Sequence, residues 1–332
     1  MLRHVPLLHT IIFSCASGLA LDQPSFRGKL IADALERNQT HVRVPCEDCP
    51  QAPSVDRVRT DFFYNSTGSQ NKVETNREQI VCHLKALIDL ALVPAVSEGG
   101  ANLQAAITEH GWMHRTCAVV SSSGIMRWHE HGERIDSAQL VLRFNDAPLK
   151  GYEHLVGHKD MVRFENMHWA QRVLDGELVP DPQIIIINVL NGGVDHQWSW
   201  THLAKQRPDL QMFQVPEQMV RKLENALRNL FDKAHFAGPN TLPTSGAMGM
   251  LLSLAMCSKV EAFGMAMSDK AVQLKDKIAY HYYEDGGQAS GNNWHQSFTP
   301  EKHLWRYLGS DPLLVDTQEI STIDIPETGC VH

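Results

Sequence analysis

Two histidines, His281 and His295, bracket the segment HYYEDGGQASGNNWH, which is rich in Gly, Ser and Asn. An imidazole with an ordinary pKa of about 6.5 takes up and releases protons near neutral pH, so both side chains are candidates for acid–base chemistry. Taken alone, the segment equally fits a surface loop between two regular elements. The elements that hold the two histidines therefore decide whether they act together.

A second group of candidates lies in PTSGAMGM, where Thr244, Ser245 and Gly246 precede an apolar stretch. This pattern predicts a helix that begins at these residues. Free backbone N–H groups and the helix dipole make a helix N-terminus a good anion site, and the two hydroxyl groups add donors. Plain N-capping of the helix is the alternative interpretation.

We expect no metal site. His129 and His131 alternate as on one face of a strand, but no third ligand is spaced near them, and RWHEHGE is interpreted as a solvated loop. Cys46 and Cys49 lack the second CxxC or HxxxH partner of a zinc site. The chain also has no Asp-x-Asp triplet, which would hold a divalent ion together with a diphosphate.

Alternating strands and helices are predicted to position these residues. Strands are expected in CAVVSSSG, AQLVLRFN, QIIIINVL, QMFQVP and KVEAFGM, and helices in NREQIVCHLKALIDLALVPAV, EQMVRKLENALRNLF and the stretch after Thr244. Such alternation is typical of an α/β fold around a mainly parallel sheet, whose ligands bind beyond the carboxyl ends of the strands. The small-residue loops 121–124 and 244–246 fall at such places.

Composition and the N-terminus indicate a secreted or luminal globular protein. Of the 332 residues 43% are hydrophobic, and a net charge of −8 without a Lys/Arg block disfavours nucleic acid as a partner. Residues 1–21 predict a signal peptide or short signal anchor, with a buried N-terminal helix as the alternative. Glycosylation sequons at Asn38 and Asn65, and six cysteines beyond this leader, fit an oxidising compartment.

Four motifs in order carry a specific resemblance. CAVVSSSGIMRWHEHGERIDSAQLVLRFNDAPLKGYEHLVGHK resembles the large sialylmotif of the eukaryotic sialyltransferases, glycosyltransferase family 29, and its RFNDAP is similar to the plant and algal branch. PTSGAMGMLLSLAMCSKVEAFGM resembles the small sialylmotif, and HYYE resembles motif III. His295 with Glu301 resembles the very small motif. The ordered set, spread over residues 117–301, carries the resemblance.

The resemblance implies a fold and a reaction. It implies a Rossmann-like α/β fold of a variant GT-A type in a catalytic domain at 106–332, behind a leader at 1–21 and a stem with a helical extension at 22–105. It implies inverting transfer of sialic acid from a CMP-sugar donor to a glycan on a glycoprotein, glycolipid or polysaccharide. No metal or other cofactor is expected, and the location is the Golgi lumen, with membrane contact only through an N-terminal anchor.

The resemblance also implies roles for single residues. Cys117 and Cys257 match the cysteines that join the large and small motifs by a disulfide. His281 matches a histidine held against the donor phosphate, and His295 matches the catalytic base. The positions that match donor-binding residues are Asn145, Thr244, Ser245, Gly246 and Gly264. The acceptor is expected to contact loops outside the motifs, such as 192–208, where Trp198 or Trp200 would stack on sugars or fill a gap under the loop.

The sequence departs from the family pattern at two positions that matter for the site. Ser122 stands where the family has a donor-binding Asn, and a hydroxyl has shorter reach than an amide. Five residues, instead of the usual four, separate His295 from Glu301, so the orienting role of Glu301 stays open. Ser122 motivates two alternatives, a CMP-Kdo donor or an inactive relative kept for binding, while the intact His281 and His295 favour an enzyme.

Overall fold

The computed structural model describes residues 11–12, 42–43, 70–166, 168–177, 182–187, 193–230, 242–274, 277–285 and 298–326. The sequons at Asn38 and Asn65 lie outside these residues, as do Cys46, Cys49 and Cys330. The predictions made for the leader and for both sequons therefore stay predictions.

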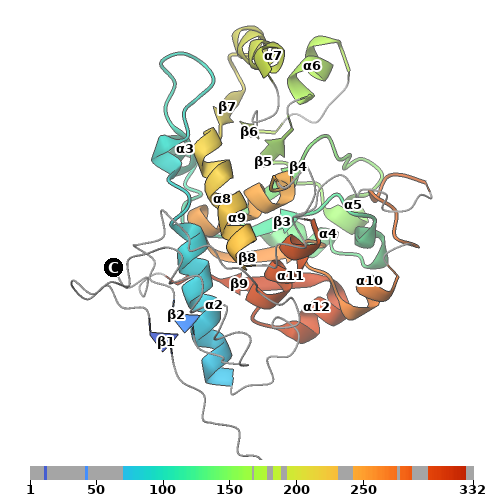
Figure 1. Cartoon of the computed structure of the whole chain (residues 1–332). Coiled ribbons are helices and arrows are strands. Elements are labelled where there is room, and N and C mark those ends of the chain that lie inside the picture. Colours follow the sequence, from blue (N-terminus) through green and yellow to red (C-terminus); the bar gives the residue numbers. More distant parts are fainter. Residues whose placement is uncertain are drawn as a thin grey trace, which may run out of the picture.

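A seven-stranded sheet with the order β7-β6-β5-β4-β3-β8-β9 forms the centre of the molecule (Figure 1). Its strands are β3 (Arg115–Val120), β4 (Leu140–Phe144), β5 (Val162–Glu165), β6 (Ile184–Ile187), β7 (Gln211–Gln214), β8 (Cys257–Phe263) and β9 (Ile320–Asp324). Every neighbouring pair is parallel except β8 and β9, which pair antiparallel. Two short strands, β1 (Ile11–Ile12) and β2 (Val42–Arg43), form a separate pair. The predicted α/β fold with a mainly parallel sheet is confirmed.

The strand order reverses direction between β3 and β8. From β3 the chain builds the sheet outward through β4, β5, β6 and β7, and then it returns to add β8 on the opposite side of β3. In open α/β sheets the crevice beyond the carboxyl ends of the strands at such a switch point is where ligands bind. The loop 121–124 follows β3 and Gly264 follows β8, so both flank this point.

Helices cover both faces of the sheet. One face carries α2 (Gln70–Lys85), α8 (Glu217–Leu230) and α9 (Ser245–Met256), which share the largest hydrophobic core with the strands. On the other face α6 (Trp169–Leu174) and α7 (Gly193–Gln206) lie together near β6 (Figure 1). The remaining elements are α3 (Leu103–Glu109), α4 (Gly132–Ser137), α5 (Glu153–Val156), α10 (Asp269–Gln273), α11 (Phe298–Leu308), α12 (Pro312–Gln318), and the 3-10 helices η2 (Leu90–Leu92) and η3 (Gly124–Trp128).

Helix α9 is apolar on all sides because it lies at the centre of this packing. It contacts β3, β4, β5, β8 and α2. A helix that is hydrophobic all round is expected in such a buried place, and the sequence of this helix indicates it directly. Residues from α2 and α3 also contribute to the core, and α2 packs against α9 and α11.

The predicted disulfide between Cys117 and Cys257 is present. Cys117 lies in β3 and Cys257 is the first residue of β8, and their Cα atoms are 6.1 Å apart. The bond therefore joins the two strands on either side of the switch point. Cys82, on α2, is also disulfide-bonded.

Several elements differ from the sequence-based expectation. The helix predicted over residues 76–96 ends at Lys85, and the 3-10 helix η2 follows it. The segment 192–208, expected to be a loop, contains α7, because Trp200, Leu203 and Ala204 recur at helical spacing and are buried against the sheet. Strand β5 was not expected because charged side chains alternate with its apolar ones. Strand β9 was not expected either. Within the described residues, no helix is both long enough and apolar enough to cross a membrane.

Candidate functional site

The loop after β3 is held in place by its own serines and by the end of β8. The N–H of Ser121 donates to the carbonyl of Phe263 at 3.0 Å, and the N–H of Ser123 donates to Ser121 Oγ at 3.0 Å. The next residue must be a glycine, Gly124, because a Cβ there would clash with the carbonyl oxygen of Ala279 at 2.4 Å. The hydroxyl of Ser122 has no hydrogen bond among the described residues, so it is available to a ligand.

The His281 segment is joined to this loop. His281 forms an antiparallel bridge with Ser123, and the N–H of Tyr282 donates to the carbonyl of Ser122 at 2.9 Å. Arg127, on η3, donates to the carbonyls of Tyr282 and Glu284. The structure therefore brings motif III directly beside Ser122, although about 160 residues separate them in the sequence.

The imidazole of His281 is oriented by a carboxylate. Its Nδ1 lies 2.6 Å from Glu284 Oε1, and the ring stacks on Tyr283 with a centroid distance of 4.8 Å. The side chain of His281 is 22% exposed. Because Glu284 can only accept when it is ionised, it assigns a proton to Nδ1 and leaves Nε2 as the other ring nitrogen.

Tyr282 has a structural part in this segment. Its hydroxyl donates to the carbonyl of Pro148 at 2.6 Å, and burial raises the pKa of the phenol to about 12. Tyr282 therefore stays neutral at physiological pH and ties motif III to the loop that follows β4.

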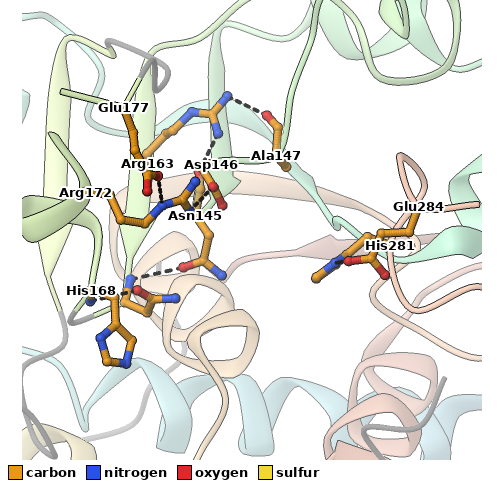
Figure 2. A network of polar contacts seen from close by, with 10 residues as sticks. Asn145, Asp146, Ala147, Arg163, His168, Arg172, Glu177, His281 and Glu284 are labelled. Carbon is orange, nitrogen blue, oxygen red and sulfur yellow. Dashed lines mark hydrogen bonds and ion pairs between the residues drawn. The ribbon is translucent and has the colours of Figure 1, made fainter. Parts of the chain in front are cut away.

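Asn145 follows β4 in the left-handed conformation, with φ +49°. Its Oδ1 accepts a hydrogen bond from the N–H of Asn166 at 3.0 Å, which fixes the orientation of the amide (Figure 2). The Nδ2 group therefore remains as the donor for a ligand. Asn is among the few residues besides Gly that adopt this conformation readily, which explains its place in the turn.

Gly264 permits β8 to end against the loop after β3. Its φ is +66°, and a Cβ at this position would lie 2.8 Å from Met126 Sδ and 3.0 Å from Ile125 Cγ2. Any larger residue would need both a strained backbone and a shift of these neighbours. The N–H of Gly264 donates to the carbonyl of Glu319 at 2.9 Å, which fixes the turn.

Thr244 caps helix α9 and binds a buried carboxylate. Its Oγ1 accepts from the N–H of Ala247 at 3.0 Å and donates to Glu301 Oε2 at 2.6 Å, while its own N–H donates to Glu301 Oε1 at 2.9 Å. Glu301, on α11, is 3% exposed. The sequence left the partner of Glu301 open, and the structure shows that it joins the small motif to the very small motif.

Ser245 and Gly246 form the first turn of α9 and are half-buried. A Cβ on Gly246 would lie 3.1 Å from Met265 Cε, so this helix N-terminus lies beside the segment that follows β8. The structure thus gathers Ser122, His281 and Gly264 with the start of α9 around the switch point. His295 lies outside the described residues.

Glu165, at the carboxyl end of β5, is a residue that the sequence analysis missed. It is fully buried, and neither carboxyl oxygen has a hydrogen-bond partner among the residues that the structure describes. Burial raises the pKa of this carboxyl to about 8, against the opposing charge of Arg163. The alternation of charged and apolar residues in VRFE was the available signal, since it places Arg163 and Glu165 on one face of a strand.

His131 is not in a solvated loop, as the sequence analysis expected. It is 4% exposed, its Nε2 lies 2.8 Å from the carbonyl of Gln318, and burial lowers its pKa to about 4. It packs against Phe263, which brings it into the interior. In the part of the chain that the structure describes, no group of three or more His, Cys, Asp or Glu side chains is arranged to hold a metal ion.

Comparison with known proteins identifies the family. The profile of glycosyltransferase family 29 (sialyltransferase) matches residues 90–312. The chain belongs to this family. The match includes all four motifs and the strands on both sides of the switch point.

Curated family 29 relatives are named as sialyltransferases. A human alpha-N-acetyl-neuraminyl-2,3-beta-galactosyl-1,3-N-acetyl-galactosaminide alpha-2,6-sialyltransferase is 30% identical over 185 residues, which are 52% of this chain and 60% of that protein. Beta-galactoside alpha-2,6-sialyltransferase 2 of Danio rerio is 29% identical over 272 residues, 70% of this chain and 49% of that protein. The chain spans about half the length of the curated relatives it matches.

Solved structures of the family were also matched. A mammalian sialyltransferase is 18% identical, with a TM-score of 0.39, over 76% of this chain and 92% of that one. A mammalian sialyltransferase in complex with Gal-beta-1-3GalNAc-ortho-nitrophenol is 17% identical, with a TM-score of 0.35, over 78% of this chain and 90% of that one.

Thr244→Val should destabilise the protein. The change removes the N-cap, which is worth about 1 kcal/mol, and the hydrogen bond that Thr244 donates to buried Glu301, which costs a further ~1–3 kcal/mol. The free energy of unfolding measured in urea should fall by about 2–4 kcal/mol. Thr244→Ser keeps the hydroxyl and should lose less than half as much. Equal stability of wild type and Thr244→Val would contradict the Thr244–Glu301 contact.

Glu165→Gln should stabilise the protein at high pH. Between the ordinary pKa of 4.5 and the folded-state value of about 8, the unfolded wild type loses the proton and the folded protein keeps it, so wild type loses stability as pH rises. Glu165→Gln has no titrating carboxyl at this position, so it does not lose this stability as pH rises. Its advantage should be absent near pH 4 and level off above about pH 8, at a few kcal/mol.

Calorimetric Tm values at pH 5 and pH 8.5 test this, because their difference cancels any pH-independent cost of the buried amide. A Tm difference between variant and wild type that is the same at both pH values would contradict the shifted pKa.

Proposed function

We propose that this chain transfers sialic acid from a CMP-linked donor to a hydroxyl group of a glycan acceptor, with inversion and without a metal ion. One observation carries the proposal. Segments of the family's motifs meet beyond β3 and β8, at the point where an α/β sheet binds its ligand. Membership of family 29 and the names of the curated relatives support the same reaction.

The proposed donor site is built from groups that suit a nucleoside monophosphate such as CMP. Asn145 offers Nδ2 donors, Ser122 offers a hydroxyl, and the N-terminus of α9 with Ser245 favours an anion. Gly264 matches the family's glycine beside the cytidine, and its missing side chain lets the loop after β3 pack against the end of β8. In this arrangement His281, oriented by Glu284, stabilises the charge that develops on the departing phosphate.

His295 is proposed as the general base. It would remove the proton of the acceptor hydroxyl while the oxygen attacks the anomeric carbon from the face opposite CMP, which inverts the configuration. The role rests on its position in the very small motif. The contact between Glu301 and Thr244 supports a different part for Glu301, namely holding the start of α9 against α11.

The acceptor is proposed to stack on Trp198 of α7. This ring is 59% exposed and lies parallel to His202 at a centroid distance of 4.7 Å, whereas Trp200 is buried against Trp169. An exposed aromatic face is the usual platform for the apolar side of a sugar. Of Trp198 and Trp200, Trp198 is therefore the one that we propose as the stacking platform for the acceptor.

The Golgi lumen is the proposed compartment, reached through the leader and retained by a signal anchor or secreted. The disulfide between Cys117 and Cys257 supports an oxidising lumen. Glycans at Asn38 and Asn65 are expected there. Digestion with an N-glycosidase should increase the electrophoretic mobility of the protein from a eukaryotic host, and unchanged mobility would count against this route.

CMP release tests the function. The purified chain is offered CMP-Neu5Ac and CMP-Kdo separately, with a panel of glycan acceptors, in EDTA. We expect release from CMP-Neu5Ac that depends on an acceptor. Release from CMP-Kdo alone would favour the second donor that Ser122 motivates. Release from neither, with CMP still bound, would favour a relative kept for binding.

His295→Ala should lower turnover by about 10²–10⁴-fold, the usual contribution of a general base, while CMP affinity stays close to wild type. His154→Ala, which removes an exposed imidazole on α5, is the matched control and should keep full activity. Steady-state kinetics and calorimetric CMP titration measure the two effects. Wild-type turnover in His295→Ala would exclude it as the base.

A further inference from the structure

The guanidinium of Arg163 is buried, and each of its three nitrogens donates a hydrogen bond. It lies in β5 and is fully shielded from solvent. Its Nη1 donates to the carbonyl of Asn145, its Nη2 donates to the carbonyl of Ala147 at 3.1 Å, and its Nε donates to Asp160 Oδ1 at 2.8 Å. Figure 2 shows the guanidinium facing the turn that carries Asn145.

The turn at Asn145 uses this partner. Asn145 and Ala147 lie beyond the end of β4, where carbonyls have no strand partner in register, and both carbonyls accept from Arg163. The planar guanidinium reaches both carbonyls at once while Asp160 fixes its third side. A Lys ammonium has no such fork and cannot span the same two acceptors in one plane.

We propose that Arg163 is a positioning residue for donor binding, which holds the turn so that the amide of Asn145 faces the nucleotide. The inference rests on the proposed function, in which Asn145 binds the donor. Arg163 itself does not contact the donor, and it acts through the two backbone carbonyls.

Glu165 makes this arrangement sensitive to pH. It follows Arg163 by two residues and shares its face of β5, and it has no hydrogen-bond donor of its own. Uncharged, it leaves the guanidinium to the two carbonyls and Asp160. Ionised, it competes with those carbonyls for Arg163. The hold on the turn should therefore weaken when Glu165 ionises at alkaline pH.

The other groups around Glu165 also come from the elements packed on it. Asp146 in the turn after β4 and Asp160 before β5 are like charges that favour the neutral carboxyl, while Arg172 on α6 opposes them. Arg172 is engaged with Asp146 and Glu177. Arg143 of β4 is in register with Arg163 and so lies on the same face of the sheet. His168 precedes α6, and β6 contributes the apolar Ile185 and Ile187. Of the cations named here, Arg163 is the one that lies on the same strand as Glu165.

Arg143 provides a matched control. It is 2% exposed, lies on the neighbouring strand, and likewise donates to two carbonyls, those of Val156 at 2.7 Å and Lys159 at 2.8 Å. These carbonyls belong to a different loop. Arg143→Lys should therefore lose a similar set of hydrogen bonds without releasing the turn at Asn145.

The test compares wild type, Arg163→Lys, Arg143→Lys and Glu165→Gln as full chains. We expect Arg163→Lys to raise the Kd for CMP and the donor KM by about 10-fold, the equivalent of one or two lost hydrogen bonds, with kcat changed less than about twofold. Arg143→Lys should keep the wild-type Kd despite a similar loss in Tm. The wild-type Kd should rise between pH 7 and pH 9, and that of Glu165→Gln should not.

An unchanged Kd in folded Arg163→Lys would overturn the inference, as would equal shifts in Arg163→Lys and Arg143→Lys. Equal pH dependence in wild type and Glu165→Gln would overturn the part assigned to Glu165. If Arg163→Lys does not fold, Asp160→Asn loosens the same guanidinium and should give a smaller shift in the same direction.

Hydrogen exchange separates this inference from the proposed function. In the ligand-free protein, amides of residues 145–147 should exchange faster in Arg163→Lys than in wild type and Arg143→Lys. Absence of CMP binding in wild type would refute the proposed function, and the exchange result would still decide whether Arg163 holds the turn. Equal exchange in all three proteins would refute the anchoring role.

Discussion

The parallel pairing of β3 with β8 is the contact on which the site depends. These strands are neighbours in the sheet but are separated by 140 residues at the disulfide that joins them. Their carboxyl ends approach closely because Gly264 has no side chain and adopts a positive φ. The Ser121–Phe263 hydrogen bond and the His281–Ser123 bridge follow from this approach. The candidate site is thus assembled around one strand pair.

Buried polar side chains hold the turns around that pair. Arg163 binds the carbonyls of the turn after β4, and Glu301 binds Thr244 at the start of α9. Glu319 accepts from Ser268 in the segment that follows β8, and burial raises its pKa. Backbone groups beyond the strand ends have no sheet partner, so side chains must supply one. These contacts give the backbone of the turns at this end of the sheet hydrogen-bond partners that the strands do not supply.

The family pattern and the local structure agree at most positions, with Ser122 as an instructive exception. Ser122 still accepts the N–H of Tyr282 through its backbone, so the loop keeps its bridge to motif III whatever side chain it carries. The substitution therefore changes what the loop offers to a ligand and leaves the loop's conformation in place.

The sequence by itself determined the features that depend on neighbouring residues and on residue type. Apolar runs predicted β3, β4, β6, β7 and β8, Thr244 predicted the start of α9, and the motifs indicated the Cys117–Cys257 bond. The tertiary structure alone decided the partner of Glu301, the backbone contacts of Arg163 and the burial of Glu165. The reason is physical. A polar side chain's partner, and the pKa that results, depend on which distant segments pack against it, and local spacing does not contain that information.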